Sequence, residues 1–479
     1  MKEYDLIVIG TGSGTNYVYP MMEANPDLKV AVVDKDEPGG ICLTRGCIPS
    51  KMLLYPAELA RDIQKAHTFG IQVNIESIDF KAVMERMRSS ISKDIEAIKK
   101  GYSYNHRIDY YREAAEFVAP YTLKAGEETI TAKMIFLSIG SKPAIPLVRG
   151  LEELVYLTSD SVLSLDDLPK SLAIIGGGYI AAEYGHFFSS MGSKVTIIGR
   201  NPFFLPNEEP EISILAKRMM SDYMDIFTNY QVLEVTSSDA GKNILARNRE
   251  TSEEIEIVAS EILVATGRSP NTDVLKPEKA GIETDALGWI KVDKHMETSS
   301  KNVWAFGDAT GKYLFKHVAN HESTVVYYNA VLGKKARADY HAVPHAVFSY
   351  PEIAGVGMSE ARAIEDYGEQ NIIIGFYRFD ETAKGIAMAL QDEFVKIILE
   401  TETQKILGAH IIGPHASVLI HEIIPVMYTA DQNADPIMHA MDIHPSLSEV
   451  IKRAFYSRMH VSDYHMIMQG LGLEENENQ

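Results

Sequence analysis

Both cysteines of this 479-residue chain lie in one short segment, GGICLTRGCIPSK, which spans residues 39–51. Four residues separate Cys42 from Cys47, and Gly46 gives the intervening backbone enough freedom for the two sulfur atoms to meet. Pro49 favours the start of a helix, so we expect Cys47 near a helix N-terminus, where the pKa of a thiol falls. The spacing is compatible with dithiol–disulfide chemistry, with two buried apolar residues, or with half of a metal site.

The metal interpretation of this segment is the weakest of the three. A zinc site would need further ligands beside the two cysteines. The sequence has no C-x-x-C pair, and the histidine nearest in sequence is His67. We therefore expect no metal here.

A second segment with the residue types for chemistry is HPSLSE, in which His444 precedes Glu449 by five residues. Imidazole titrates near neutral pH and can move a proton on and off sulfur. A carboxylate beside the ring would fix its orientation and favour the imidazolium form. The alternative is a surface or packing histidine, one of 15 in the chain.

The N-terminal segment has the pattern of a dinucleotide-binding unit. The apolar run YDLIVIG leads into a glycine turn with Gly10 and Gly12, and the second apolar run KVAVVD ends at Asp34, 24 residues after Gly10. Strand, glycine turn, helix, strand and acid follow in the order that places a pyrophosphate on a helix N-terminus and a ribose hydroxyl on the carboxylate. Thr15 departs from the pattern, because glycine or alanine is usual at the third position.

The same pattern returns 166 residues later, in SLAIIGGGYIAAEYGHFFSSMGSKVTIIGR. Gly176, Gly178 and Ala181 occupy the three turn positions, so two such units in one chain predict two dinucleotides. The second strand ends in Gly199 and Arg200 instead of an acid. An arginine there can pair with a 2′-phosphate, which favours NADP(H) over NAD(H) unless Arg200 simply points into solvent.

Composition and charge narrow the class of protein. Apolar residues make up 46% of the chain and charged residues 23%, as in globular proteins, and the length predicts two to four compact units. The formal charge of −20 argues against a nucleic-acid partner. No apolar run reaches the ~18 residues of a membrane helix. The acidic start MKEYDLIVIG is unlike a signal peptide, so we expect a cytoplasmic protein with no membrane partner.

The chain resembles the FAD-dependent pyridine nucleotide–disulfide oxidoreductases (class I). The segments that carry the resemblance are YDLIVIGTGSG, GGICLTRGCIPSK, GGGYIAAEYG, VATGRSPNT, AFGDAT and HPSLSE, in the family's order and over nearly the whole chain. The resemblance implies an α/β fold with two Rossmann-like domains and a C-terminal α+β dimerisation domain. The implied limits are 1–150 and 271–343 for the FAD domain, 151–270 for the NAD(P) domain and 344–479 for the dimerisation domain.

The resemblance also assigns roles. Cys42 is the expected interchange thiol and Cys47 the flavin-facing thiol; Lys51 and Glu183 match an ion pair beside the flavin. His444 and Glu449 match an acid–base pair that comes from the second subunit of a homodimer, so the active sites are expected to be shared. The implied FAD contacts are Gly10, Gly12, Gly14, Asp34, Gly40, Lys51, Gly140, Gly307 and Asp308. The implied NAD(P) contacts are Gly176, Gly178, Tyr179, Ile180, Arg200 and Gly267.

Several branches of the family fit poorly. Mercuric reductases carry a further C-terminal cysteine pair, soluble transhydrogenases lack the full pair found here, and glutathione reductases usually have a second arginine where this chain has Pro206. HPSLSE and GCIPSK resemble dihydrolipoamide dehydrogenase, although that branch normally keeps an acid at the position of Gly199. CIPSKMLLYPAELA resembles mycothione reductase, which reduces a low-molecular-weight disulfide with NADPH. The sequence leans slightly to a lipoamide substrate, with a peripheral place in a 2-oxo-acid dehydrogenase complex as one possible setting.

Overall fold

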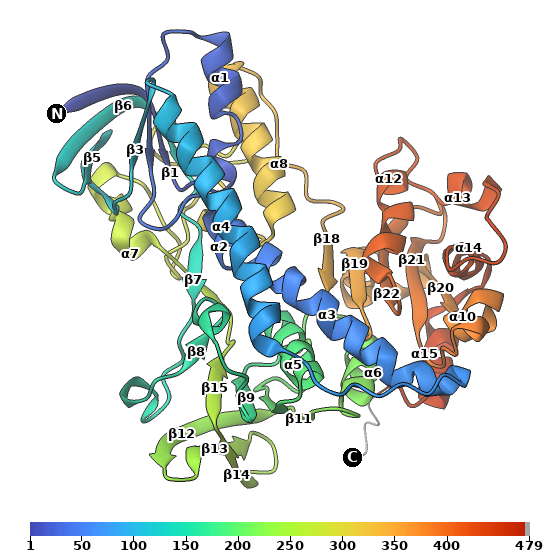
Figure 1. Ribbon diagram of the computed structural model, residues 1–479. Helices are drawn as coiled ribbons and strands as arrows, with labels where there is room; N and C mark the ends of the chain where they lie inside the picture. The colour runs from blue at the N-terminus through green and yellow to red at the C-terminus, as the bar shows by residue number, and fades with distance from the viewer. Residues whose placement is uncertain (475–479) are drawn as a thin grey trace.

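The computed structural model describes residues 1–474, which form three units (Figure 1). The order of elements confirms the expected fold class: two α/β units, each with a parallel strand–glycine turn–helix–strand motif, precede an antiparallel sheet with helices. Residues 475–479, the predicted end of the third domain, lie outside the described residues.

The first unit is built on a seven-stranded sheet in the order β3-β2-β1-β6-β5-β4, with β17 also paired to β6. Strands β3, β2, β1, β6 and β17 run parallel, and β4 and β5 are antiparallel additions. The apolar runs at β1 and β2 are buried, as a covered parallel sheet requires. The strands are β1 Lys2–Ile9, β2 Val30–Val33, β3 Ile108–Tyr111, β4 Ala115–Ala119, β5 Thr122–Ala125, β6 Glu128–Leu137 and β17 Val303–Ala305.

Six helices belong to this unit, and α4 is the longest, running beside α3 across the molecule (Figure 1). The Asp79 side chain accepts a hydrogen bond from the Ala82 N–H and caps α4. Across residues 1–474, neither α4 nor another helix combines the length and the apolar character needed to cross a membrane. The helices are α1 Val18–Ala24, α2 Gly40–Thr44, α3 Cys47–Lys65, α4 Phe80–Tyr104, α7 Thr272–Leu275 and α8 Lys316–Val326.

The second unit has a five-stranded parallel sheet in the order β11-β10-β9-β15-β8, beside a three-stranded antiparallel sheet β12-β13-β14. A short ribbon, β7 Ser141–Pro143 with β16 Arg268–Pro270, links it to the first unit. Its elements are β8 Leu157–Thr158, β9 Ser171–Ile175, α5 Tyr179–Met191, β10 Lys194–Ile198, α6 Pro210–Met220, β11 Asp225–Phe227, β12 Tyr230–Ser238, β13 Gly241–Asn248, β14 Glu254–Ala259 and β15 Glu261–Val264.

The third unit is a six-stranded antiparallel sheet in the order β18-β19-β22-β21-β20-β23. Its strands are β18 Pro344–Val347, β19 Ile353–Gly357, β20 Ile372–Arg378, β21 Phe394–Glu400, β22 Ile406–Ile412 and β23 Arg458–His460. Its helices are α9 Glu360–Tyr367, α10 Ala383–Ala387, α11 Ala416–Leu419, α12 Ile424–Met427, α13 Asp435–His439, α14 Glu449–Tyr456 and α15 Val461–Gly470.

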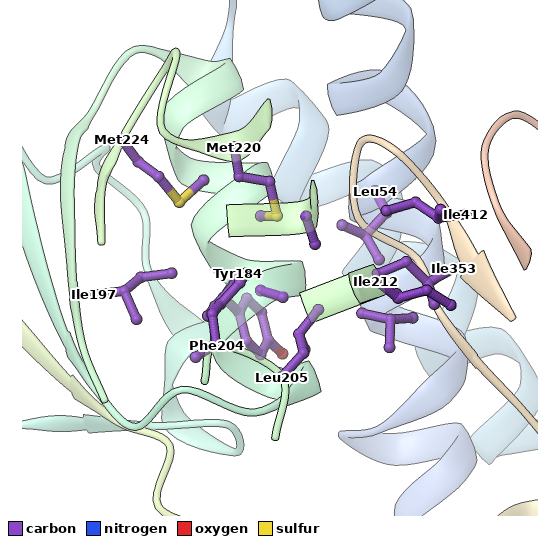
Figure 2. Packing of buried hydrophobic residues seen from close by; sticks show 14 of the residues in the cluster. Leu54, Tyr184, Ile197, Phe204, Leu205, Ile212, Met220, Met224, Ile353 and Ile412 are labelled. Atoms are coloured by element: carbon purple, nitrogen blue, oxygen red, sulfur yellow. The ribbon is translucent and has the colours of Figure 1, made fainter. Parts of the chain in front are cut away.

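One hydrophobic cluster joins the three units. It contains Leu54 of α3, Tyr184 of α5, Ile212 of α6 and Ile353 and Ile412 of the third unit, as Figure 2 shows. Because these side chains are buried against one another, moving one unit would expose apolar surface on the others. The core therefore fixes the walls of the site described next.

Candidate active site

A cavity of about 830 Å³ is lined by residues of all three units. This volume is typical of a small-molecule or cofactor site. The predicted site residues that line it are Gly10, Gly12, Asp34, Gly40, Cys42, Cys47, Lys51, Gly140, Tyr179, Ile180, Glu183, Gly307 and Asp308. The others, Gly14, Gly176, Gly178, Arg200, Gly267, His444 and Glu449, lie outside the lining of this cavity.

The first glycine turn brings backbone against the cavity. Gly40 has φ +68°, and a Cβ there would lie 2.5 Å from the Cα of Gly12, so two glycines meet where the cysteine segment begins. Gly14 instead packs against the sheet, where a Cβ would lie 2.1 Å from Ser138 Oγ. The turn continues as a single 3₁₀ turn, Ser13–Thr15, and α1 begins only at Val18.

The Asp34 carboxylate is tied to this turn. Asp34 Oδ2 accepts hydrogen bonds from the Thr11 N–H at 2.8 Å and from Thr11 Oγ1 at 2.6 Å. Thr11 Oγ1 also accepts from the Gly39 N–H at 3.0 Å. One threonine therefore joins the end of β2 to the start of the cysteine segment.

A second carboxylate, Asp308, lines the cavity from the turn after β17. Ser141 Oγ donates to Asp308 Oδ2 at 2.6 Å, and Arg268 Nε donates to Ser141 Oγ at 2.5 Å. Burial raises the pKa of Asp308 above the usual carboxyl value, against the opposing effects of Ser141 and Arg268. Arg268 is a cavity residue that the sequence analysis missed, although it stands inside the VATGRSPNT motif.

The two cysteines occupy adjacent helices: Cys42 lies in α2, and α3 begins at Cys47. Both are free thiols. A hydrogen bond with Cys42 is the largest influence on Cys47 and lowers its pKa to about 7; burial opposes this shift and the Lys51 charge supports it. The same hydrogen bond, together with burial, raises the pKa of Cys42. The pair therefore holds a thiolate on Cys47 near neutral pH and keeps Cys42 protonated.

An ion pair stands beside Cys47. Lys51 Nζ lies 2.9 Å from Glu183 Oε1 and 2.8 Å from Oε2, and Glu183 Oε1 also accepts from the Phe348 N–H at 3.2 Å. Lys51 Nζ lies 4.6 Å from the centre of the Phe348 ring. The three residues come from α3, α5 and the end of β18, so this contact joins all three units.

Two further cations near the cysteines were not predicted. Lys316, the first residue of α8, donates to Ser13 Oγ at 2.9 Å, and its charge lowers the pKa of Cys42 against the larger opposing causes. Arg45 lies between the cysteines in sequence and pairs with Asp36 at 2.5 Å and with Asp160 at 3.1 Å. Arg45 could have been found inside the cysteine motif, whereas nothing near Lys316 in sequence points to the cysteines.

The backbone of the second glycine turn packs closely against the residue that follows β15. Gly176 has φ +130°, and a Cβ there would lie 2.2 Å from the Ala265 carbonyl oxygen. Gly178 is the N-cap of α5, whose free N–H groups suit a pyrophosphate. Tyr179 and Ile180, the first two residues of α5, reach the main cavity, and burial raises the pKa of Tyr179 to about 12.

The predicted acid–base pair forms a contact of its own. His444 Nδ1 lies 3.0 Å from Glu449 Oε1, and the Ser446 N–H donates to Glu449 Oε2 at 3.2 Å. The hydrogen bond with His444 is the largest cause that lowers the pKa of Glu449. The His444 side chain is 68% exposed and lies apart from the cavity that holds the cysteines. One chain therefore brings Cys42, Cys47, Lys51 and Glu183 together, and leaves the exposed His444, with the buried Glu449 beneath it, in the third unit outside this cavity.

Family models match both parts of the chain. The pyridine nucleotide-disulphide oxidoreductase model matches residues 4–327, and the dimerisation domain of the same family matches residues 343–455. The residues around the main cavity fit FAD. The cavity runs from the first glycine turn, past Asp34 and Asp308, which are held by hydrogen bonds, to the cysteine pair.

Relatives and solved structures agree over nearly the full length. Mycothione reductase of Mycobacterium tuberculosis is 34% identical over 95% of this chain and 99% of its own. Dihydrolipoyl dehydrogenase of Chlamydia muridarum is 36% identical over 94% of this chain and 95% of its own. The copper(II) complex of the HOCl-induced flavoprotein disulfide reductase RclA from Escherichia coli superimposes with a TM-score of 0.84 at 27% identity, over 95% and 99% of the two chains. The chain therefore belongs to the pyridine nucleotide–disulphide oxidoreductase family and is a flavoprotein disulfide oxidoreductase that uses FAD and a pyridine nucleotide.

Proposed function

We propose that this enzyme uses NADPH to reduce a small disulfide, with Cys42 as the thiol that exchanges with the substrate. The observation that carries the proposal is the cysteine pair on the wall of the cavity, with one thiol of lowered pKa beside Lys51. FAD, when bound, supplies the two-electron transfer between the nicotinamide and the cysteine pair. In this proposal the Cys47 thiolate at the helix N-terminus faces the flavin, and Cys42 exchanges with the substrate once a base has taken its proton.

The protein's own residues have distinct tasks in this proposal. Lys51 stabilises the Cys47 thiolate by its charge, and Glu183 holds the Lys51 ammonium group in place. Tyr179 and Ile180, which follow the second glycine turn at the start of α5, form the part of the cavity wall where the nicotinamide would approach the flavin. In thiol–disulfide exchange the attacking thiol loses a proton and the leaving thiolate gains one. An acid–base group near the sulfur atoms must therefore accept and return that proton.

We propose that the proton passes through His444 of a second subunit. His444 carries an oriented imidazole, yet it does not reach the cysteines of its own chain. Its neighbours Met441 and Ile443 are 99% and 80% exposed, which is unusual for apolar side chains and favours a partner that covers them. A two-fold homodimer, in line with the matched dimerisation domain, would place this face against the partner's cavity.

The end of β10 supports the order in which we place the substrate candidates. It carries Gly199 and Arg200 and no carboxylate for a ribose hydroxyl, which favours NADPH and a reductase of a low-molecular-weight disulfide. Although the motifs, weighed together with the same two residues, lean slightly to lipoamide, we place the low-molecular-weight disulfide first because this strand end offers no carboxylate to a ribose hydroxyl. Lipoamide is the second candidate, because HPSLSE and GCIPSK resemble dihydrolipoamide dehydrogenase.

The test is the purified FAD-loaded enzyme assayed with oxidised lipoamide, glutathione disulfide and mycothiol disulfide, each with NADH and NADPH at equal concentration. The proposal expects faster turnover with NADPH and a small-thiol disulfide. Fast lipoamide turnover with NADH would establish the second candidate instead. In the C42S variant, bound FAD should remain while reduction of every disulfide is lost; retained turnover would overturn the role of Cys42.

A further inference from the structure

The end of β10 is the place where a Rossmann unit meets the adenosine ribose of its nucleotide. Here the backbone of Gly199 lies directly on the glycine turn, since a Cβ on Gly177 would come 3.2 Å from the Gly199 Cα. The Gly199 N–H donates to the Phe227 carbonyl of β11 at 2.8 Å, which fixes the strand end. Arg200 follows immediately and is exposed.

A second arginine reaches the same strand end from a distant segment. Arg249 lies in the turn between β13 and β14, and its Nη1 donates to the Arg200 carbonyl oxygen at 3.0 Å. The turn is anchored there, because the Arg249 N–H donates to the Asn229 carbonyl at 2.8 Å and the Asn229 N–H donates to the Asn201 carbonyl at 2.7 Å. The Arg249 guanidinium is therefore held against the backbone of Arg200 at the end of β10.

The charges at this position are uncompensated. Within residues 1–474, neither Arg200 nor Arg249 forms an ion pair, whereas Arg247 in the same hairpin pairs with Glu254 at 2.6 Å. Glu250, the residue after Arg249, accepts from Asn229 Nδ2 at 3.4 Å. In an acidic protein, two exposed arginines at one strand end, without carboxylate partners in the described part of the chain, form a site that suits a dianion.

We propose that Arg249 and Arg200 together bind the 2′-phosphate of NADPH, so that the β13–β14 turn sets the choice of nucleotide. This inference rests on the proposed use of NADPH. Arg249 supplies the second guanidinium that the loop after β10 does not provide, where Pro206 stands. Planar guanidinium groups match the phosphate oxygens in a bidentate manner, and the hydrogen bond to the Arg200 carbonyl fixes the orientation of one of them.

The test measures binding of adenosine 2′,5′-bisphosphate and of AMP to the FAD-loaded enzyme by calorimetry, in wild type, R200Q, R249Q and R249K. R247Q is the matched control, because it removes an arginine of the same hairpin that is already paired. We expect R249Q and R200Q each to weaken binding of the bisphosphate by about 10- to 100-fold, the range for a lost hydrogen bond to a charged group. R249K should recover part of the lost affinity for the bisphosphate. R247Q should bind the bisphosphate as the wild type does, and the affinity for AMP should be the same in all variants.

Steady-state kinetics provide the second readout. R249Q should raise the KM for NADPH by a similar factor and leave the KM for NADH as it is. If the wild type binds AMP and the bisphosphate equally, the proposed NADPH preference fails together with the inference. If the wild type prefers the bisphosphate and R249Q binds it as well as the wild type does, the role of Arg249 is overturned and the NADPH proposal stands.

Discussion

The ammonium group of Lys51 lies within 2.9 Å of both carboxylate oxygens of the buried Glu183. Since Glu183 also accepts the backbone N–H of Phe348, one carboxylate connects α3, α5 and the start of the third unit. The charge of Lys51 is thereby fixed one turn into the helix that begins with Cys47. Because Lys51 acts on the pKa of Cys47, its effect can be measured on the thiol itself, without knowledge of the substrate.

We predict that K51M raises the pKa of Cys47. In the wild type the pKa of Cys47 is lowered to about 7. The hydrogen bond with Cys42 is the largest cause, burial opposes it, and the charge of Lys51 lowers the pKa further. Removing the charge favours the neutral thiol, so alkylation of Cys47 in the reduced protein should reach its half-maximal rate at a higher pH than in the wild type. The readout is the pH dependence of iodoacetamide labelling, resolved for each cysteine by mass spectrometry. K65M, at the opposite end of α3, is the control; an unshifted profile in K51M would contradict the role of Lys51.

We predict that G40A loses FAD. A Cβ at Gly40 would lie 2.5 Å from the Gly12 Cα, and the left-handed backbone at φ +68° is unfavourable for alanine. The cysteine segment and the glycine turn must then separate, which disturbs both walls of the cavity. The ratio of flavin to protein absorbance after purification should fall well below that of the wild type. G470A, whose Cβ meets no atom within 4 Å, should keep its FAD; equal flavin content in both variants would argue against the proposed FAD site.

We predict that a shared active site can be rebuilt from two defective chains. C42S should lack the exchange thiol and H444A the acid–base group, so each homodimer should be nearly inactive in disulfide reduction. A mixed dimer of the two retains one site with both groups, and we expect activity to return to about one working site per heterodimer. Reduction of the bound flavin by NADPH should proceed in H444A at the wild-type rate. Mixing that restores nothing would exclude the contribution of His444 from a second subunit.

Local sequence signals predicted the parts of the site that depend on backbone geometry. Both glycine turns and the start of α3 at Cys47 follow from glycine freedom, apolar runs and Pro49, and the structure has them at those positions. The contact between His444 and Glu449 also follows from a short spacing. These features are local, so neighbouring residues contain the information.

Side chains that reach the site from distant segments could not be predicted in this way. Lys316 approaches the cysteines because α8 packs beside the first glycine turn, and Arg249 approaches Arg200 because a hairpin docks on β11 and β10. Position 206 in the loop after β10 is a proline, and the second arginine at this strand end comes instead from a segment 49 residues after Arg200. Only the tertiary fold places these cations.

The same limit applies to a buried charge cluster between the second and third units. Lys396 of β21 is 1% exposed, and its Nζ lies 2.5 Å from Glu209, 2.6 Å from Glu211 and 2.7 Å from Glu360. Tyr464 also donates to Glu211. Lys396 provides the cation for three buried carboxylates at the contact between α6 and the third unit.

We predict that K396M destabilises the fold by about 3–5 kcal/mol, because it leaves buried carboxylates without their cation. In the wild type, burial alone would raise the pKa of Glu209, but Lys396 and His410 hold it below the usual value, so this group stabilises the fold above the ordinary carboxyl range and less as the pH falls. In K396M burial dominates, the carboxylates bind protons more tightly in the folded state, and stability should fall as the pH rises above about 4.5.

The difference in unfolding free energy between K396M and wild type should therefore be larger at pH 8 than at pH 5, measured by urea unfolding of the FAD-loaded protein. K133M removes a lysine that is 88% exposed and should change stability little at either pH. A deficit in K396M that is equal at both pH values would show that lost packing, and not uncompensated charge, is the cause.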